Sequence, residues 1–458
     1  MRIRLNYPLN ILEICKATDG TIIGNFNSNP SINYICTDTR ECEAEDLFIA
    51  LQGENDSGEK YINEAIKKGC YVMSTGPSSS GIHVNDTSDA LINLAKYYKF
   101  KTEIKYTVAV TGSVGKSTTV KFLSRILAQR YKVHSPKDNF NNHIGVPITL
   151  LGTPKNSEIL IAELGMNHKK EISRLSKCIR PDIGVITSIG SSHIGNLGSR
   201  EAIANAKLEI LDGIEKGILL LPYSEALLKG VSNGLYVDLN SSVSDFSLNK
   251  LNDHRYEFTS IYGNLSYNSL IDLPKHLLID LSFAISVAKI LNMTDTEIIN
   301  GIKMISDSDL RQRFIELNDF TIFDDSYNAS LESIKADLDH ISKFSRPLGA
   351  FLGDVLELGD NAVSIHEKIG REAAKHKLDH LYLYGEYANV IAKGAIDEGM
   401  DPDSIFINTD LSEPNTSIGH IRKYHFKNEL ILFKASHKLR LDRIADMIAK
   451  EERTNNDR

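Results

Sequence analysis

Residues 108–119 read VAVTGSVGKSTT, and this stretch decides the fold of the middle of the chain. An apolar, β-branched run ends at Thr111, a glycine loop follows, and helical spacing then begins. The helical spacing is carried by four apolar residues, Val120, Leu123, Ile126 and Leu127. Strand, glycine loop and helix in this order predict a loop that holds a phosphate group, because backbone N–H groups and the helix N-terminus attract anions.

The loop residues have separate expected roles in binding a nucleotide. Lys116 can reach the outer phosphates, and the Ser117 hydroxyl can ligate Mg²⁺. Val110 stands where the usual G-x-x-x-x-G-K-[ST] pattern has its first glycine, and Gly112 follows two places later. A glycine turn that binds nothing is the alternative, and the flanking strand and helix argue against it. The expected nucleotide-binding set is Gly112, Ser113, Gly115, Lys116, Ser117 and Thr118.

Length and composition limit the class of protein. A chain of 458 residues with 41% hydrophobic content predicts about three domains. The net charge of −8 argues against an extended nucleic-acid surface, so we expect small-molecule partners and no nucleic acid. No stretch approaches the roughly 18 apolar residues of a membrane span, so we expect a cytoplasmic protein without membrane insertion, and a monomer by default.

The cysteines favour a reducing compartment over a disulfide framework. They form no C-x-x-C pair and are odd in number. We expect all five to be buried or neutral thiols: Cys15, Cys36, Cys42, Cys70 and Cys178.

The pattern of strands and helices changes along the chain and predicts an α/β fold. The first hundred residues mix short strands such as LFIAL with an amphipathic helix and predict a small α/β unit. From Tyr106, apolar strands alternate with helices, which predicts a parallel sheet with crossover helices. Between about Tyr223 and His276 the sequence is polar and short-stranded, and we expect an antiparallel side sheet of the same domain. After DLRQRF the alternation resumes and predicts a second doubly wound domain.

Two polar residues follow strands of the predicted central sheet. Glu163 comes after ILIA, and His193 follows VITSIGSS. With Ser117 they could supply a carboxylate, an imidazole and a hydroxyl to one Mg²⁺ held against nucleotide phosphates. Taken alone, a strand-end glutamate is more often a capping group and a single histidine more often a hydrogen-bonded structural residue, so the prediction depends on the phosphate loop.

Eight segments then occur in one order along the chain. They are TGSVGKST, NFNNHIGVPITLL, AELGMNHKKEISRL, RPDIGVITSIGSSHIGNLGS, NAKLEIL, DDSYNAS, LGDVLELGDNAVSIHEKIG and FKASHKLRL. In sequence and spacing they resemble the Mur ligases of bacterial cell-wall synthesis, and most of all the branch of that family that adds D-alanyl-D-alanine. The resemblance runs from about Asp38 to Arg440.

The resemblance implies three domains and one type of reaction. The domains are an N-terminal one for the UDP end of the substrate (1–104), a central P-loop ATPase (105–310) and a C-terminal Rossmann-like one that receives the amine (311–458). ATP phosphorylates a peptide carboxylate, and an amine or dipeptide attacks the resulting acyl phosphate. The implied partners are a UDP-linked peptide or sugar acid and that amine; the implied cofactors are ATP and two Mg²⁺ ions.

The same resemblance assigns roles to single residues. Lys116 matches the phosphate-loop lysine, and Ser117, Glu163 and His193 match Mg²⁺ ligands. Lys207 matches a lysine that the family carries as a carbamate, which supports the second Mg²⁺; spacing alone would make it a solvated helix lysine. In the C-terminal domain the nucleotide contacts are implied to be Arg313, Asp325, Tyr327 and Asn328.

The substrate-binding residues implied by the resemblance come from three segments. The triplet Asp38, Thr39 and Arg40 is expected near the uridine diphosphate, although a charged turn is an equally good interpretation of TDTRE alone. The substrate cleft is implied to contain Asn141, Asn142 and Thr149, and the amine site Lys434, Ser436 and His437.

Several positions depart from the family pattern. The asparagines that read adenine are replaced by Leu277 and Asp280, and Gln312, Ser330 and Ala435 replace Gly, Asn and Gly. Three hypotheses stay open: the D-alanyl-D-alanine-adding ligase, a Mur-like ligase of another pathway that joins a different amine to a different nucleotide-linked acid, and an ATPase scaffold without ligase chemistry. The third is the weakest because Ser117, Glu163, His193 and Lys207 are all present.

Overall fold

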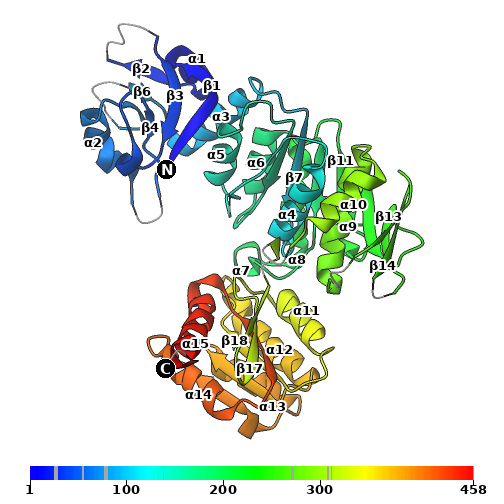
Figure 1. Ribbon diagram of the computed structural model, residues 1–458. Coiled ribbons are helices and arrows are strands. Elements are labelled where there is room, and N and C mark those ends of the chain that lie inside the picture. The colour runs from blue at the N-terminus through cyan, green and yellow to red at the C-terminus, as the bar shows by residue number, and fades with distance from the viewer. Residues whose placement is uncertain are drawn as a thin grey trace.

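Three β-sheets follow one another along the chain, and helices cover each of them (Figure 1). The computed structural model describes residues 1–24, 29–53, 56–76, 81–137, 139–252, 254–269, 273–306, 309–310 and 312–456. Across these ranges, no helix has both the length and the apolar character needed to cross a bilayer.

The N-terminal sheet has six strands in the order β1-β3-β4-β5-β6-β2. Its inner strands β3 to β6 pair in parallel, while β1 and β2 are antiparallel edge strands. The strands are β1 (Arg2–Asn10), β2 (Thr21–Ile23), β3 (Ser31–Cys36), β4 (Leu47–Ile49), β5 (Tyr71–Ser74) and β6 (Gly81–His83). The helices are α1 (Ile11–Thr18), α2 (Ile62–Lys67) and α3 (Thr87–Lys99), with short 3-10 helices η1 (Thr39–Glu41) and η2 (Gly58–Tyr61).

The central sheet has nine strands in the order β15-β14-β13-β12-β11-β10-β7-β9-β8. The strands are β7 (Tyr106–Thr111), β8 (Val133–His134), β9 (Ile159–Glu163), β10 (Ile183–Ile186), β11 (Ile218–Pro222), β12 (Gly234–Leu239), β13 (Phe246–Lys250), β14 (Arg255–Ser260) and β15 (Leu265–Asn268). The helices are α4 (Lys116–Leu127), α5 (Gly145–Leu151), α6 (Glu171–Ile179), α7 (Ile194–Leu197), α8 (Arg200–Leu208), α9 (Lys275–Ile290) and α10 (Asp295–Lys303), with 3-10 helices η3 (Glu209–Gly213) and η4 (Ala226–Leu228).

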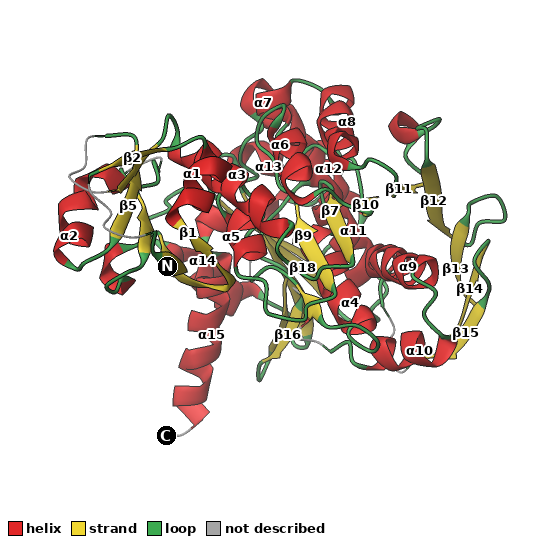
Figure 2. Cartoon of the chain, turned by 90° about the horizontal axis from the view of Figure 1, so that it is seen from above, coloured by secondary structure: helices red, strands yellow, loops and turns green. Residues whose placement is uncertain are grey.

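The polar segment between Tyr223 and His276 extends this same sheet and does not form a separate one. Its first strand, β12, pairs in parallel with β11 and β13. Antiparallel pairing begins only at β13–β14 and continues to β15. The expected antiparallel strands are therefore present, and they form one end of the central sheet. Figure 2 shows these strands at the outer edge of the central body, on the side away from the N-terminal sheet.

The C-terminal sheet has six strands in the order β16-β17-β21-β18-β19-β20. All its pairs are parallel except β16–β17, so the predicted doubly wound domain is confirmed. The strands are β16 (Arg313–Glu316), β17 (Phe320–Asp324), β18 (Leu348–Gly353), β19 (His380–Tyr384), β20 (Ile405–Asn408) and β21 (Glu429–Lys434). The helices are α11 (Leu331–Ile341), α12 (Ala362–Lys375), α13 (Ala388–Asp397), α14 (Pro414–Tyr424) and α15 (Leu441–Asn456), with 3-10 helices η6 (Gly359–Asn361), η7 (Pro402–Ser404) and η8 (His437–Leu439).

The apolar core explains how the first two sheets are joined. Helix α3 of the N-terminal part packs against α5 and α6 of the central part, and one continuous cluster of buried residues runs from Ile3 to Leu228. The opposite face of the central sheet is covered by α4, α9 and α10 around a second cluster. The C-terminal sheet has its own cluster on each face, so it forms a separate body below the central one in Figure 1.

Helices α12 and α13 approach each other through two glycines. A Cβ atom at Gly370 would lie 2.0 Å from the carbonyl oxygen of Ile391, and one at Gly394 would lie 2.1 Å from that of Glu367. Neither position can hold a larger residue unless the helices separate. Gly419 in α14 differs, because a Cβ there would meet no atom within 4 Å.

These glycines give a first prediction: replacement by alanine should change the stability of the C-terminal body in opposite directions at the two positions. Gly370→Ala should destabilise the C-terminal body by about 2 kcal/mol or more, because a backbone contact must open. Gly419→Ala should stabilise it by up to about 1 kcal/mol, because alanine favours a helix where space is free. Thermal unfolding midpoints of the two variants check this; a shift of both in one direction would contradict the packing described.

Candidate active site

The ends of three neighbouring parallel strands place the first site residues side by side. Strands β10, β7 and β9 are adjacent, and all three are parallel. The phosphate loop follows β7, Glu163 is the last residue of β9, and the segment with His193 follows β10. The expectation that polar residues meet at the carboxyl edge of this sheet is confirmed in the strand order.

The phosphate loop has the backbone that its glycines predict. Gly115 has a φ of +89°, a conformation that favours glycine, and a Cβ atom there would lie 2.4 Å from Asp280 Oδ1. At Gly112 an added Cβ would lie 1.9 Å from Thr187 Oγ1. Ser188 holds the loop from the other side, since its carbonyl oxygen accepts from Ser113 N at 3.0 Å.

Lys116 and Ser117 begin helix α4 directly after this loop. Lys116 Nζ donates to the carbonyl oxygen of Gly112 at 2.9 Å, so its ammonium lies over the loop. The Ser117 hydroxyl donates to Glu163 Oε2 at 2.6 Å, and Asn141 Nδ2 donates to Glu163 Oε1 at 2.9 Å. The Glu163 side chain is 2% exposed. A buried carboxylate, a hydroxyl and an amide therefore converge beside the loop.

Lys207 is buried in the same cavity, on α8. It is 2% exposed, and within the described part of the chain its ammonium has no hydrogen-bond or ion-pair partner. Burial lowers the pKa of Lys207 well below its usual value, and the nearby charge of Lys116 lowers it further. The solvated ammonium suggested by helix spacing alone is therefore wrong for this lysine.

His193 is paired with a residue of the C-terminal part. Its Nδ1 lies 2.5 Å from Glu357 Oε2, and this contact lowers the pKa of the Glu357 carboxyl. The backbones of the two segments are also in contact, because Gly195 N donates to the carbonyl oxygen of Glu357 at 3.1 Å. The structure thus brings Ser117 and Glu163 together, and it directs the His193 ring toward Glu357.

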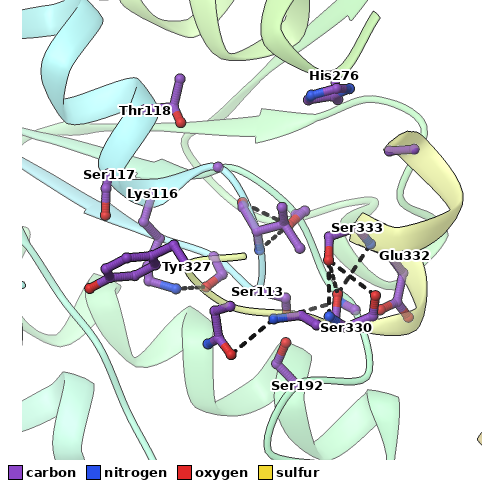
Figure 3. Close-up of a pocket in the computed structure, with 18 of the residues that line it drawn as sticks. Ser113, Lys116, Ser117, Thr118, Ser192, His276, Tyr327, Ser330, Glu332 and Ser333 are labelled. Atoms are coloured by element: carbon purple, nitrogen blue, oxygen red, sulfur yellow. Dashed lines mark hydrogen bonds between the residues drawn. The ribbon is translucent and has the colours of Figure 1, made fainter. Parts of the chain in front are cut away.

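A cavity of about 520 Å³ lies between the phosphate loop and the C-terminal sheet. Figure 3 shows Lys116, Ser117 and Thr118 at the start of α4, with Tyr327, Ser330, Glu332 and Ser333 facing them from the C-terminal part. Glu332 Oε2 accepts from Ser191 Oγ at 3.0 Å, so the two sides already touch. The predicted residues that line the cavity are Gly112, Ser113, Gly115, Lys116, Ser117, Thr118, Asn141, Glu163, His193, Lys207, Asp325, Tyr327, Asn328, Lys434 and His437.

On the C-terminal side of the cavity, Lys434 lies between two carboxylates. Its Nζ contacts Asp325 and is 2.8 Å from Asp337 Oδ2. Burial alone would lower the pKa of Lys434, but Asp325 and Asp337 together raise it above its usual value. Burial raises the pKa of the Asp337 carboxyl well above its usual value despite this lysine.

Gln312 connects this group to the central part. Its Nε2 donates to Asp337 Oδ1 at 2.8 Å and to His276 Nε2 at 3.1 Å. His276 can accept this bond because burial lowers its pKa to about 4 and keeps the ring neutral. A series of contacting side chains therefore connects α9 of the central part to β21 of the C-terminal part.

Asp280 replaces a family asparagine on the loop side of α9. Its Oδ1 accepts from Thr119 Oγ1 at 3.2 Å, and the side chain is buried against Gly115. Burial raises the pKa of Asp280 well above its usual value, which the Thr119 hydrogen bond offsets only in part. A protonated carboxyl has one donor and one acceptor, as the amide of asparagine also offers.

Seven predicted residues lie outside the lining of this cavity. Asn142 accepts from Ile144 N and Gly145 N, and the Thr149 hydroxyl is buried against the Gly145 carbonyl within α5. Ser436 Oγ accepts from Leu356 N at 2.9 Å. Arg313 is paired with Asp324 at 2.6 Å and with Asp446 at 2.9 Å. The triplet Asp38, Thr39 and Arg40 forms the turn around η1 in the N-terminal part, where Asp38 caps the helix and pairs with Arg40 at 2.6 Å.

Sequence reasoning missed Asp337 and Glu332, and it included Glu357 only as part of the segment GDVLELG. Asp337 left a signal, because it interrupts the buried stripe of α11 that Ile334, Leu338 and Ile341 form at helical spacing. A carboxylate in such a stripe needs a buried partner, which is Lys434. Glu332 left none, because its partner Ser191 comes from a distant segment of the chain.

The residues around the loop fit a nucleotide held with a hard cation. Glu163 and Ser117 supply oxygen ligands of the kind Mg²⁺ prefers, and the loop faces phosphate oxygens that could complete its coordination. Across the described ranges, no three His, Cys, Asp or Glu side chains converge as a ready-made metal site. A cation here therefore depends on ligands beyond those four residue types.

Comparison with known families gives two matches. Residues 110–283 match the Mur ligase middle domain, and residues 311–436 match the Mur ligase glutamate ligase domain. Together the matches cover the phosphate loop and the C-terminal segments that line the cavity.

Relatives and solved structures agree along nearly the whole chain. The chain is 33% identical to UDP-N-acetylmuramoyl-tripeptide–D-alanyl-D-alanine ligase of Bacillus subtilis, over 95% of this chain and 96% of that protein. It is 29% identical to the protein of the same name in Synechocystis, over 98% and 100%. The fold matches MurF of Acinetobacter baumannii with a TM-score of 0.88 at 24% identity, over 97% of this chain and 100% of that one. It matches MurF of Thermotoga maritima in complex with ADP with a TM-score of 0.80 at 25% identity, over 92% and 98%. The chain therefore belongs to the Mur ligase family.

Proposed function

We propose that the chain is an ATP-dependent ligase that joins D-alanyl-D-alanine to UDP-N-acetylmuramoyl-tripeptide and releases ADP and phosphate. The observation that carries this proposal is the likeness over nearly the full length to relatives named for that reaction, combined with the phosphate loop in the cavity. The reaction would make a precursor of peptidoglycan. Because it consumes ATP, we place it in the cytoplasm.

The chemistry requires that a carboxylate become an electrophile. A carboxylate resists attack because oxide would have to leave, whereas an acyl phosphate loses phosphate. Transfer of the γ-phosphoryl group brings two anions together, so positive charge must offset their repulsion. We assign this role to Lys116, whose ammonium lies over the loop at Gly112. The amine then attacks the acyl carbon, and the tetrahedral intermediate collapses to the amide.

We propose that two Mg²⁺ ions act with ATP in this cavity, and that they supply charge neutralisation at the phosphates. Ser117 and Glu163 would hold the first, and His193 would join them. For the second we assign Lys207 as a carbamate. Its burial without a partner supports this, because a neutral amine is the form that adds CO₂, and the carbamate turns a misplaced positive charge into a ligand.

The substrates are proposed to meet the three parts of the chain in turn. The UDP end of the acid would lie at Asp38–Arg40 in the unit 1–104, and its peptide would run past Asn141, Asn142 and Thr149 in the unit 105–310. In the unit 311–458, Arg313, Asp325, Tyr327 and Asn328 are assigned to the nucleotide. The amine site is assigned to Lys434, Ser436 and His437. His437 supports this placement, since its ring lies 5.4 Å from that of Tyr327 in the cavity.

A second candidate is a Mur-like ligase with another amine or acid. The replacements at Leu277, Asp280, Ser330 and Ala435 favour it, because all lie at or beside the cavity. One assay separates the candidates. ADP release should require both UDP-N-acetylmuramoyl-tripeptide and D-alanyl-D-alanine. Turnover with only a different pair would transfer the assignment to the second candidate, and full turnover without either would indicate a plain ATPase.

Lys116→Ala should reduce turnover at least about a hundredfold, because it removes a charge directed at the transferring phosphoryl group. Binding of the UDP-linked acid should change little, since that site lies in the N-terminal part. Steady-state kinetics and titration calorimetry measure the two effects. Loss of both would refute the division between the two sites.

Lys207→Ala should be nearly inactive, because the missing group is a carboxylate and not an ammonium. Lys207→Arg should be equally impaired, since arginine cannot form the carbamate. The matched control is Lys216→Ala, at an exposed lysine of the same part, which should keep the parent rate.

The pH dependence follows from the same group. CO₂ adds only to the neutral amine, so parent activity should fall as pH falls and as CO₂ is removed, and it should return with bicarbonate. Small carboxylates such as acetate should partly rescue Lys207→Ala, and small amines should not. A Lys207→Arg variant at full rate would show that positive charge suffices and would remove the carbamate from the proposal.

A further inference from the structure

Three of the five cysteines lie close together in the N-terminal part of the fold. Cys36 ends β3, Cys42 follows η1, and Cys70 precedes β5. All three are buried in one small apolar cluster that also contains Phe48 and Val72. Cys178 is buried elsewhere, in the core shared with the central part, and Cys15 lies on α1.

Two thiols of this cluster contact the same backbone carbonyl. Cys36 Sγ and Cys42 Sγ lie 3.0 Å and 3.5 Å from the carbonyl oxygen of Asp38. Cys42 lies in the same cluster as Cys36 and Cys70, and both of these thiols raise its pKa. Cys70 also donates to the carbonyl oxygen of Glu43 at 3.1 Å. The turn from 36 to 42 therefore closes on itself through two sulfur atoms.

The two neighbouring thiols differ in acidity. The hydrogen bond from Cys42 lowers the pKa of Cys36 to about 7, although burial opposes this and Asp46 opposes it slightly. The same contact raises the pKa of Cys42. All three thiols are buried, as the sequence predicts. The thiol of lower pKa is the better nucleophile of the pair, and its neighbour keeps a proton to give to a leaving group.

We propose that Cys36 and Cys42 are a peroxide-sensitive pair that forms a reversible disulfide at the base of the Asp38–Arg40 turn. The Cys36 thiolate attacks one oxygen of hydrogen peroxide, the O–O bond breaks, and hydroxide leaves, which gives a sulfenic acid. The Cys42 sulfur then attacks the Cys36 sulfur, and the hydroxyl leaves as water with the Cys42 proton. Two thiols and one peroxide thus give one disulfide and two waters.

A disulfide in a reducing compartment is usually a transient, sensing bond and not a structural one. Two thiols that share one backbone carbonyl, at 3.0 Å and 3.5 Å, need little movement to reach the S–S length of about 2.05 Å. Cys70 is assigned no bond in this proposal, because it donates to Glu43 and not to the Asp38 carbonyl.

The bond would change the segment between the two sulfurs. Oxidation removes both S–H groups, so the Asp38 carbonyl loses both sulfur donors. Asp38 also caps η1 through Arg40 N at 3.0 Å and pairs with the Arg40 guanidinium. If this triplet binds the UDP end of the acid, a consequence that rests on the proposed function, oxidation should weaken that binding and leave ATP binding unaffected.

Peptide mapping tests the bond itself, independently of any activity. Trypsin separates the cysteines onto peptides 5–16, 17–40, 41–60, 69–96 and 178–200, the last because the Arg180–Pro181 bond is not cleaved. After the full chain is treated with hydrogen peroxide and alkylated, mass spectrometry should find 17–40 joined to 41–60 without the two thiol hydrogens. Dithiothreitol should reverse it. Cys36→Ser and Cys42→Ser should each abolish the cross-link, and the controls Cys70→Ser and Cys178→Ser should keep it.

Contrary results are equally clear in this assay. A cross-link between 41–60 and 69–96, or sulfinic acid without any cross-link, would overturn the proposal. The parent chain decides the matter even if a serine variant fails to fold.

Kinetics test the consequence for the turn. The KM for the UDP-linked acid should rise about fivefold in the oxidised parent, the effect of one lost hydrogen bond, and the KM for ATP should not change. Cys42→Ser should show no response to peroxide. If the disulfide is mapped but the KM for the UDP-linked acid does not change, the effect of oxidation on the Asp38–Arg40 turn is refuted. If the chain does not use a UDP-linked acid at all, the proposed function is refuted, but the disulfide proposal is not affected.

Discussion

The phosphate loop passes so close to β10 and α9 that neither of its glycines has room for a side chain. A Cβ at Gly112 would enter the Thr187 hydroxyl, and one at Gly115 would enter the Asp280 carboxyl. This close approach fixes the start of α4, and with it the positions of Lys116 and Ser117. The Ser117 hydroxyl then fixes Glu163 at the end of the neighbouring strand. The site thus begins with backbone sterics, and its charges are placed afterwards.

The ionisable side chains buried around this loop are stabilised in three ways. Lys207 and Asp280 are held toward their neutral forms by burial. Lys434 keeps its charge because two carboxylates flank it. Glu163 is satisfied by donors from Ser117 and Asn141. Isolated buried charges are costly, so the charge state of each of these side chains limits which ligand charges the cavity can bind. A neutral Asp280 removes a negative charge from beside the expected phosphates, so the replacement of asparagine by aspartate is compatible with an anionic ligand.

The sequence predicts those features that depend on local pattern. Apolar strands alternating with helices predict the parallel sheets, and Gly115-Lys116-Ser117 predicts the loop, because both follow from neighbours in the chain. Partners chosen by tertiary packing are not visible in this way. Ser117 and Glu163 are 46 residues apart, and Lys434 and Asp325 are 109 apart. The antiparallel strands at the end of the central sheet are predicted, but their attachment to that sheet is not visible, because short polar strands show their period and not the neighbour with which they pair.

Two of the departures from the family pattern, Ser330 and Gln312, form hydrogen bonds in their new surroundings. Ser330 replaces an asparagine, and its hydroxyl caps α11 by accepting from Ser333 N at 3.2 Å. Gln312 replaces a glycine and gains bonds to His276 and Asp337. Asp337 in turn is an ion-pair partner of Lys434, the residue before Ala435. Gln312 is thus connected through Asp337 to the residue before Ala435, on the C-terminal side of the cavity. Asp280, by contrast, lies against Gly115 of the phosphate loop, so the replacements occur on both sides of the cavity.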